Sequence, residues 1–556
     1  EVTLRAHAAA VRRCAQEQAA RCLPAALADA LAWAAEHHDL GKLDRRFQLL
    51  LNNGQPGEGD PLAKSACVLR SWRRGSVLAA EDKLPAGFRH EMLSLAIAQA
   101  VETDLAPQPR ELALHLIASH HGHARPFAPV VVDGAPEAAE IEAALEEYFA
   151  PGEPAPVPDP LPAHHLASGV ADRFWRLTRR YGWWGLAYFD AILRLADQQA
   201  SREGEKESAK DGKADDAPPP ERAAVRWAGP RHSPKRADVE LAAVDGANPL
   251  GFLAALGALR LLSDGDPARR FALGWERGGA GYRPLLSADG GLDAQSVLDL
   301  LEKRQHAGEM FPPALLTAAA AAGPRNKNGE AAWEGKLKFP VAELRRCCAS
   351  LICGGVSPAY LSAWAGECGA EEEKGVWIAL RTRFDFTAGQ QQFVSMAQSL
   401  ANSVTTDDLA AALFSGWRAR AGTSMRWDPE DEKRQYALQA FDPTDAKSNP
   451  PRGDPGANLL ACHGLTFFPL AADRAASQPG FGGSGPGKLF TWPIWSPPIS
   501  ADAIGSLLAR FSAGEGGPPA PGVAAVMCAR IVTPSGRYRC FAPARHLVAA
   551  KARHAQ

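Results

Sequence analysis

Apolar residues recur at helical spacing through the first 200 or so residues of the chain. Leu23, Leu27 and Leu31 are spaced four residues apart, and they predict an amphipathic helix whose apolar face leads round to residue 38. Interruptions by proline and glycine are short in this part of the sequence. The pattern therefore predicts a helical domain over residues 1–201.

The pattern changes twice after this helical part. Residues 202–238 combine many charged side chains with three consecutive prolines, which predicts a flexible interdomain linker, although a solvated charged helix is an alternative. Residues 239–556 mix a predicted helix at about 250–262 with strand candidates at 375–386 and 522–532. We therefore expect a multidomain protein in which an all-α domain is followed by an α+β domain.

Composition narrows the class of protein. A chain of 556 residues is too long for one typical core, and its hydrophobic content of 46% is sufficient for two or three. The formal net charge is -2, so any surface for nucleic acid has to be local. The ten cysteines include no Cys-x-x-Cys pair, and no long apolar run appears. These features predict a cytoplasmic protein with reduced thiols and no membrane association.

Candidate chemistry is concentrated in the helical part, which holds ten of the 15 histidines. His38 and Asp39 are adjacent at the end of an apolar helical face, where a buried imidazole and a buried carboxylate both need partners. Imidazole offers a neutral nitrogen, and a carboxylate can bridge two cations. The pair suits a metal centre, although a single His-Asp pair says little by itself.

Five more candidate ligands lie near the ends of apolar helical faces in the same part of the chain: His7, His90, His120, His121 and Asp197. A single helical histidine is most often a surface residue or a hydrogen-bonded core residue. An aspartate near a helix end often pairs with an arginine, here Arg194. Several helices that each bring one or two nitrogen or oxygen ligands are harder to explain in that way. The joint pattern therefore favours a metal centre.

The stretches that carry this pattern are His7, His38-Asp39-x-x-Lys42 with Phe47-Gln48, Leu62-Ala63-Lys64-Ser65, Arg89-His90-Glu91, His120-His121-Gly122 with Arg125-Pro126, and Leu195-Ala196-Asp197-x-x-x-Ser201. In this order they resemble the HD superfamily, and specifically the HD nuclease of type I CRISPR systems, which is usually joined to or partnered with a helicase. The resemblance covers essentially all of residues 1–201. The combination is specific, although no single stretch is.

This resemblance implies a centre of two divalent metal ions bridged by Asp39. The first ion would be held by His7, His38, Asp39 and Asp197, and the second by Asp39, His90, His120 and His121. Lys42 would contact the scissile phosphate or the attacking hydroxide, and Ser201 would support the site. Nitrogen-rich ligation favours Mn, Fe, Co or Ni over Mg. His37, His115 and His123 in the same part of the chain are left as supporting or surface residues.

Four further stretches stand out in the second half: Asn248-Pro249-Leu250-Gly251, Phe386-Thr387-Ala388-Gly389-Gln390, Ser424-Met425-Arg426-Trp427-Asp428-Pro429 and Trp492-Pro493-Ile494-Trp495. The first opens a helix rich in alanine and glycine that would allow close packing, and the last predicts a rigid aromatic turn. Together they resemble a subunit of the type I-G (formerly I-U) CRISPR surveillance complex, over most of residues 239–550. The resemblance implies a large-subunit role in reading the duplex motif beside the target and holding the displaced strand.

Two arginine–aromatic pairs are candidates for contact with nucleic acid. Arg426 beside Trp427, and Arg434 beside Tyr436, could hold phosphates and stack on bases. The alternative is that these aromatic side chains only pack in a core.

Taken together, the two resemblances imply a CRISPR antiviral effector subunit. Its metal-dependent nuclease would cut single-stranded, displaced non-target DNA, and its second half would assemble with the crRNA-guided surveillance complex. The sequence contains no P-loop motif, so a separate CRISPR helicase is an expected partner. One alternative is an HD phosphohydrolase acting on nucleotides or cyclic dinucleotides, which would leave the second half unexplained. Another is a non-catalytic structural large subunit with a decayed HD domain, against which the intact ligand set argues.

Overall fold

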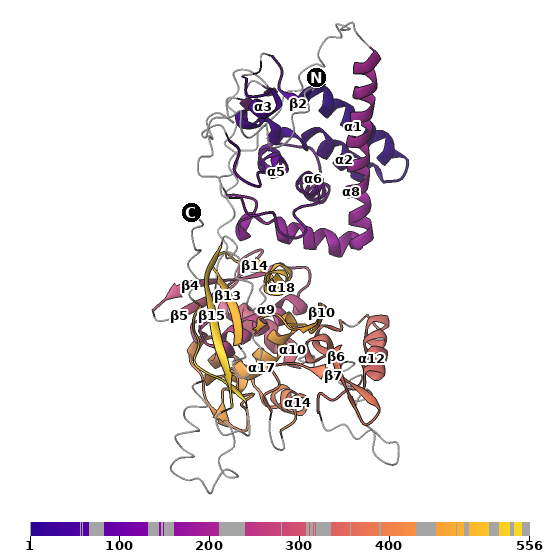
Figure 1. The fold of residues 1–556 in the computed structure, drawn as a ribbon. Coiled ribbons are helices and arrows are strands. Elements are labelled where there is room, and N and C mark those ends of the chain that lie inside the picture. The colour runs from indigo at the N-terminus through magenta and orange to yellow at the C-terminus, as the bar shows by residue number, and fades with distance from the viewer. Residues whose placement is uncertain are drawn as a thin grey trace, which may run out of the picture. The chain divides into compact units, whose positions relative to one another are not determined.

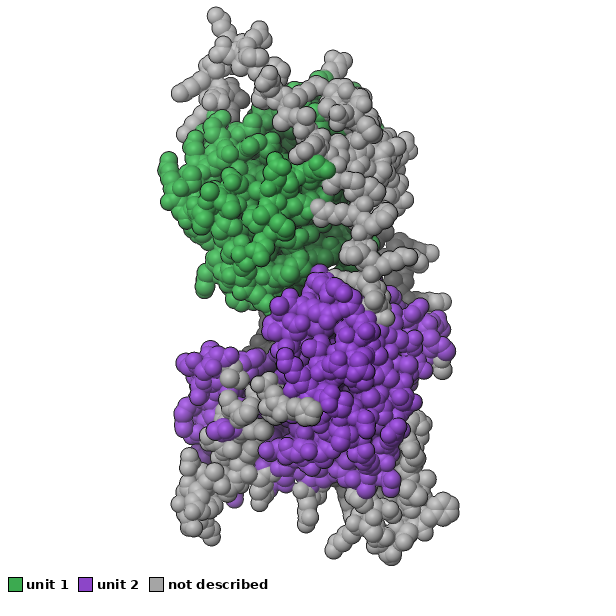
Figure 2. Space-filling model, turned by 180° about the vertical axis from the view of Figure 1, so that it is seen from behind, with its two compact units in different colours: residues 1–233 green, residues 234–556 purple. Residues whose placement is uncertain are grey.

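The computed structural model forms two compact units, residues 1–233 and residues 234–556, shown in green and purple in Figure 2. The structure describes all of the chain except residues 1, 56, 58, 66–82, 132–143, 146–147, 150–160, 211–238, 280, 307–310, 312–314, 316, 318–334, 356, 388–390, 430–451, 474, 483–488, 511–521, 534–538 and 548–556, together with the side chains of residues 204–210 and 471–477. None of the described helices is long and apolar enough to cross a membrane.

The N-terminal unit is mainly helical, in agreement with the hydrophobic pattern (Figure 1). Its elements are β1 (Val2–Thr3), α1 (Leu4–Ala20), α2 (Ala25–His37), the 3-10 turn η1 (Leu40–Leu43), α3 (Arg45–Leu51), β2 (Leu62–Lys64), α5 (His90–Ala100), α6 (Pro107–Ser119), the 3-10 turn η3 (Leu166–Ser168) and α8 (Val170–Lys210). The antiparallel pair of β1 and β2 is an addition to the all-α prediction. Such short strands leave no hydrophobic alternation that a sequence pattern could reveal.

Four helices, α1, α2, α6 and α8, build the core of this unit. Val11, Leu31, Leu116 and Leu193 contribute one side chain from each, and all four are at most 1% exposed. These positions lie on the helical faces that the apolar spacing predicts. The core thereby fixes the ends of the helices, where the candidate ligands lie.

The last helix of the unit corrects the predicted start of the linker. α8 continues to Lys210, so residues 202–210 are helical. The alternative to a linker for this stretch was a solvated charged helix, and the structure has a helix over these residues. The remaining part of the predicted linker, residues 211–238, lies outside the described residues.

A buried histidine makes the stability of this unit depend on pH. His115 is 1% exposed and packs against Phe174, and burial together with the charges of Arg125 and Arg173 lowers its pKa to about 3. The unfolded chain therefore binds the proton more tightly, and the free energy of unfolding should fall as pH drops from about 6.5 toward about 3.

The pH dependence can be tested with His115→Phe, which keeps the site apolar. Lowering the pH from about 7 to about 5 should cost the wild-type chain about 2 kcal/mol more than this variant. Urea unfolding of both full chains in EDTA, at the two pH values, measures the difference. Identical pH dependence in both would show that His115 is protonated as easily in the folded state as in the unfolded state.

The C-terminal unit mixes helices and antiparallel strands (Figure 1). Its helical elements are α9 (Pro249–Gly265), α10 (Ala294–His306), α12 (Val341–Cys353), α13 (Ala359–Trp364), α14 (Phe393–Ser403), α15 (Thr406–Ala410), the π-helix η4 (Ala411–Ser415), α17 (Pro455–Gly464), the 3-10 turn η5 (Leu465–Phe467) and α18 (Ala501–Arg510). Its strands are β3 (Val239–Glu240), β4 (Phe271–Gly278), β5 (Gly281–Ala288), β6 (Ala365–Glu373), β7 (Val376–Arg381), β8 (Arg420–Ala421), β9 (Arg452–Gly453), β10 (Ala471–Asp473), β11 (Ala475–Ser477), β12 (Phe481–Gly482), β13 (Leu489–Trp495), β14 (Ile499–Ser500), β15 (Val523–Val532), β16 (Cys540–Phe541) and β17 (Arg545–His546).

Two sheets contain most of the strands of this unit. One has five strands in the order β12-β13-β15-β16, with β17 also paired to β15, and the other has four strands in the order β14-β4-β5-β3. The strand predictions at 375–386 and 522–532 correspond to β7 and β15, and the helix prediction at 250–262 corresponds to α9.

The glycine-rich helix packs as closely as its composition predicts. A Cβ atom added to Gly257 of α9 would lie 1.7 Å from the main-chain oxygen of Leu460 in α17, so only glycine permits this helix crossing. The prediction of an aromatic turn is wrong, because Trp492 and Trp495 lie in strand β13. Both are fully buried, and their indole nitrogens donate to the carbonyls of Gly246 and Leu273 at 2.9 and 2.7 Å.

Candidate metal centre

The structure brings all seven candidate ligands into one region of the N-terminal unit. They are His7 on α1, His38 and Asp39 after α2, His90 at the first residue of α5, His120 and His121 after α6, and Asp197 on α8. Four of them, His7, His38, Asp39 and His120, are almost completely buried. Ligands contributed by five separate helical segments are held by the packing of the core rather than by one flexible loop.

The ligands form two sets with Asp39 between them. In each of three groups the ligand atoms lie within 4.8 Å of one another: His7, His38 and Asp197; His90, His120 and His121; and His38, Asp39 and His120. The first two groups correspond to the two sets that the sequence resemblance implies, and the third links them through Asp39. The residues of each group could hold a divalent metal ion.

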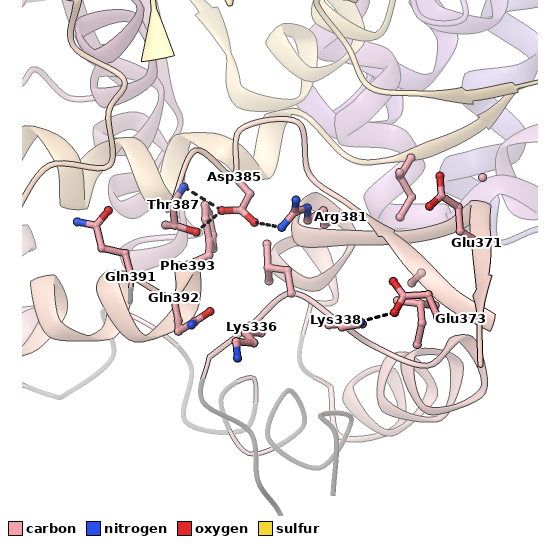
Figure 3. Close-up of a pocket in the computed structure, with 15 residues that line it drawn as sticks. Lys336, Lys338, Glu371, Glu373, Arg381, Asp385, Thr387, Gln391, Gln392 and Phe393 are labelled. Atoms are coloured by element: carbon pink, nitrogen blue, oxygen red, sulfur yellow. Dashed lines mark hydrogen bonds and ion pairs between the residues drawn. The ribbon is translucent and has the colours of Figure 1, made fainter. Parts of the chain in front are cut away.

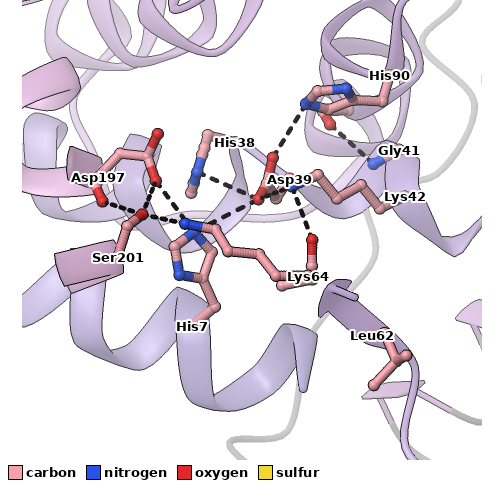
Figure 4. A network of polar contacts seen from close by, with 12 residues as sticks. His7, His38, Asp39, Gly41, Lys42, Leu62, Lys64, His90, Asp197 and Ser201 are labelled. Atoms are coloured by element: carbon pink, nitrogen blue, oxygen red, sulfur yellow. Dashed lines mark hydrogen bonds and ion pairs between the residues drawn. The ribbon is translucent and has the colours of Figure 1, made fainter. Parts of the chain in front are cut away.

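The two carboxylate oxygens of Asp39 face different ligands (Figure 4). Its Oδ2 lies 3.6 Å from Nε2 of His7 and 3.5 Å from Nε2 of His38, and its Oδ1 lies 3.0 Å from Nε2 of His90. Burial alone would raise the pKa of Asp39, but its electrostatic interactions with His38 and Lys42 and the contact with His90 hold it well below its usual value. Asp39 is therefore an ionised carboxylate placed to bridge the two sets.

Four buried imidazole nitrogens of the centre have no well-directed hydrogen bond: Nε2 of His7, His38, His90 and His120. Nδ1 of His38 donates to the carbonyl of Ala35, and Nδ1 of His120 donates to that of Ile117, both at 2.7 Å. These bonds leave the Nε2 atoms of both rings with a lone pair directed into the centre. Buried polar atoms without partners are rare and costly, and a metal ion would satisfy them. The residues therefore fit the group that the resemblance implies.

Burial keeps three histidines of the centre, His38, His120 and His121, in the neutral state that binds metal. Burial lowers the pKa of His38 and His121 and holds the pKa of His120 well below its usual value. The pKa of Asp197 is also lowered: burial alone would raise it, but the contacts with His7 and His38 outweigh that effect. Neutral imidazoles and ionised carboxylates are the forms that coordinate cations.

A close backbone contact aligns the loop after Asp39 with helix α5. The main-chain nitrogen of Gly41 donates to the hydroxyl of Ser94 at 2.8 Å, and a Cβ atom on Gly41 would lie 2.0 Å from the main-chain oxygen of His90. Only glycine fits between this loop and the first turn of α5. The contact places Asp39 beside His90.

Lys42 and Gln48 connect the same loop to strand β2. Nζ of Lys42 donates to Oδ2 of Asp39 at 2.7 Å and to the carbonyl of Ala63 at 3.3 Å. The side-chain amide of Gln48 donates to the carbonyls of Lys42 and Leu62 at 2.7 and 3.0 Å, and accepts from the nitrogen of Leu62 at 2.8 Å. Gln48 therefore positions β2 against the Lys42 loop, a role that the sequence did not suggest.

Ser201 and Lys64 lie on the other side of the centre (Figure 4). The hydroxyl of Ser201 donates to the main-chain oxygen of Asp197 at 2.6 Å, and Nζ of Lys64 donates to the same hydroxyl. Lys64 lies in one of the stretches that carry the resemblance, but no role for it could be predicted from that stretch. Its direction becomes apparent only once β2 is paired with β1, which places Lys64 opposite Val2.

The remaining histidines of this unit lie outside the three ligand groups. His37 stacks on Trp33 at a ring distance of 4.2 Å, and its Nδ1 donates to the carbonyl of Trp33. His115 packs in the core, and His123 is half-buried.

The structure corrects the prediction that Trp427 stacks on bases. Trp427 is fully buried, and its indole nitrogen donates to the carbonyl of Phe384 at 3.0 Å. Arg426 beside it is also buried, with 7% of its surface exposed, so this pair forms part of the core. Arg434 and Tyr436 lie outside the described residues.

A pocket of about 580 Å³ opens in the C-terminal unit between residues 336–338, β7 and the start of α14 (Figure 3). Lys338 is ion-paired with Glu373, and Nη1 of Arg381 lies 3.2 Å from Oδ2 of Asp385. The pocket is therefore of mixed charge. Among the described residues, all three potential metal-ligand groups belong to the N-terminal unit and none to this pocket.

Comparison with known proteins identifies the N-terminal segment. Residues 1–172 match the family model described as Cas3, HD domain. This match supports a type I CRISPR-associated HD segment, and the family implies the fold of a metal-dependent hydrolase or nuclease. It includes six of the seven candidate ligands, and Asp197 follows it on α8. No curated protein and no solved structure matches the chain.

Proposed function

We propose that the N-terminal unit is a metal-dependent nuclease that cuts single-stranded DNA, in particular a displaced non-target strand. The observation that carries the proposal is the group of four buried histidine nitrogens, none with a well-directed hydrogen bond, around one carboxylate, Asp39. This group lies within the segment that matches the Cas3 HD domain. The intact set of ligands argues against a decayed, purely structural domain.

The residues that would hold the ions are the two sets that share Asp39. When bound, two divalent cations lower the pKa of a shared water and neutralise charge on an in-line phosphoryl transition state. His7, His38 and Asp197 would hold one cation, and His90, His120 and His121 the other. Mn, Fe, Co and Ni suit this nitrogen-rich set better than Mg.

The chain itself contributes orientation and charge. The carbonyls of Ala35 and Ile117 hold His38 and His120 in the tautomer whose Nε2 carries the lone pair. Lys42, held at Asp39, adds a positive charge where a phosphodiester would approach. Because these groups are fixed before the substrate arrives, little reorganisation is needed during cleavage.

We further propose that residues 239–556 join the nuclease to a crRNA-guided surveillance complex that presents the target DNA. The proposal is supported by the sequence resemblance of that part to a type I-G large subunit. Placing both parts in one chain would keep the nuclease resident in the complex at a high effective concentration. A separate CRISPR helicase would then be required for long-range degradation of the duplex.

The nuclease proposal can be tested with the purified full chain and a labelled single-stranded oligonucleotide. Cleavage is expected with Mn, Co or Ni and should stop in EDTA. His38→Gln should abolish cleavage, whereas His115→Gln should retain it, although both remove an imidazole that is 1% exposed. Only His38 belongs to a ligand group.

The outcomes separate the competing functions. Cleavage that persists in EDTA would refute the metal-dependent mechanism. Hydrolysis of nucleotides or cyclic dinucleotides without any cutting of DNA would favour an HD phosphohydrolase instead.

A further inference from the structure

Strand β2 directs Lys64 toward the metal centre. Successive side chains of a strand point to opposite faces, and Ala63 is buried in the core. Lys64 therefore projects from the other face, and it is half-buried. Pairing of Lys64 with Val2 places it just before α1, the helix that carries His7.

The hydroxyl of Ser201 connects the ammonium group of Lys64 to Asp197, a candidate metal ligand. Its Nζ donates to the hydroxyl of Ser201, which itself donates to the main-chain oxygen of Asp197 at 2.6 Å. Oγ of Ser201 lies 3.5 Å from Oδ1 of Asp197, and that oxygen lies 3.1 Å from Nε2 of His7. Lys64 therefore borders the His7, His38 and Asp197 set (Figure 4).

Lys64 and Lys42 differ in what neutralises their charge. Nζ of Lys42 lies 2.7 Å from a carboxylate oxygen of Asp39, so its charge is already paired. Within the described part of the chain, Lys64 bonds a neutral hydroxyl and is in no ion pair. An ammonium group has three hydrogen-bond donors, and one neutral acceptor leaves it able to bind an anion.

We propose that Lys64 binds a non-bridging phosphate oxygen of the DNA strand on the Asp197 side of the centre. The inference rests on the proposed nuclease function, which supplies the phosphodiester. Exchanging a neutral hydroxyl for a phosphate oxygen gives Lys64 a charge-assisted hydrogen bond, and Ser201 keeps its bond to Asp197. The carbonyl of Ala63 already holds Lys42, so β2 organises one lysine on each side of the centre.

The test measures binding of DNA rather than cleavage. The full chain is titrated, in Mn, with a fluorescent phosphorothioate oligonucleotide that resists cutting, over a series of salt concentrations. Each phosphate contact to a single strand contributes about 0.7 to the slope of log affinity against log salt concentration. Lys64→Gln should lower the slope by about 0.7, weaken binding at low salt, and leave the affinity for Mn unchanged.

Three further variants separate phosphate binding from a structural role. Lys64→Arg should restore most of the salt dependence, because it keeps the charge. Ser201→Ala should leave the slope unchanged, because it removes a neutral partner. Lys338→Gln, at an ion-paired lysine of the C-terminal unit, should also leave it unchanged.

Two results would overturn the proposal. One is an unaltered salt slope in Lys64→Gln. The other is a weakened affinity for Mn shared by Lys64→Gln and Ser201→Ala, which would show that Lys64 only positions Asp197. A normal Lys64-dependent slope in a protein that never cuts unmodified DNA would instead refute the nuclease and leave the phosphate site intact.

Discussion

Asp39→Asn is expected to abolish metal-dependent cleavage, with a loss of about 10³-fold or more, because the ions supply several kcal/mol of transition-state stabilisation. Asp39 faces both ligand sets, so one substitution affects both ions. The amide cannot replace the negative charge that two neighbouring cations require. Metal analysis of the purified full chain should show a loss of bound Mn that parallels the loss of cutting.

Asp190→Asn is the matched control for this substitution. Asp190 on α8 is 5% exposed and Asp39 is 3% exposed, so both are buried carboxylates. The partners of Asp190 are the hydroxyl of Ser119 at 2.6 Å and Nη2 of Arg125 at 2.7 Å, and it belongs to no ligand group. This variant should keep its Mn even if its melting temperature falls. Two ions bound with unchanged affinity in Asp39→Asn would show that Asp39 is not the bridge.

The candidate ligands could be picked out from the sequence because most of them lie at the ends of helices. The apolar spacing of a helix indicates which way its last residues face, and His38 and His120 follow directly after the faces of α2 and α6. No local pattern says that these ends meet at one point. The order of the ligands, compared with a known family, supplied that information.

Features that depend on contacts between distant segments could not be predicted. Lys64 reaches Ser201 across 137 positions of the chain, through a pairing of strands of two and three residues. The sequence around Trp427 is compatible both with stacking on a base and with packing in a core. Only the burial of Trp427 in the structure decides between these two roles. The charged end of α8 was predicted to be part of a linker. Its composition is compatible with both a solvated helix and an unstructured segment, so the sequence could not distinguish the two.

Gly41→Ala is expected to weaken one side of the metal centre without touching a ligand. The added Cβ would lie 2.0 Å from the main-chain oxygen of His90 and 2.9 Å from the main-chain nitrogen of Ser94, so the first turn of α5 has to move. Nε2 of His90 lies 3.0 Å from Oδ1 of Asp39, and the movement would separate them. Overpacking of this kind costs about 1–3 kcal/mol of stability.

The expected result is a loss of about 10- to 100-fold in affinity at one of two Mn sites, as for other changes to residues that orient ligands. Calorimetric titration with Mn distinguishes this from a uniform loss. The three atoms nearest the added Cβ all belong to α5, which carries no residue of the set of His7, His38 and Asp197, so that set should keep its ion. Gly505→Ala, where an added Cβ meets open space on α18, is the control for the exchange itself. If Gly41→Ala does not fold, Ser94→Ala tests the same alignment by removing the hydrogen bond from Gly41. Two Mn sites of unchanged affinity in a folded variant would mean that α5 can shift without moving His90 from Asp39.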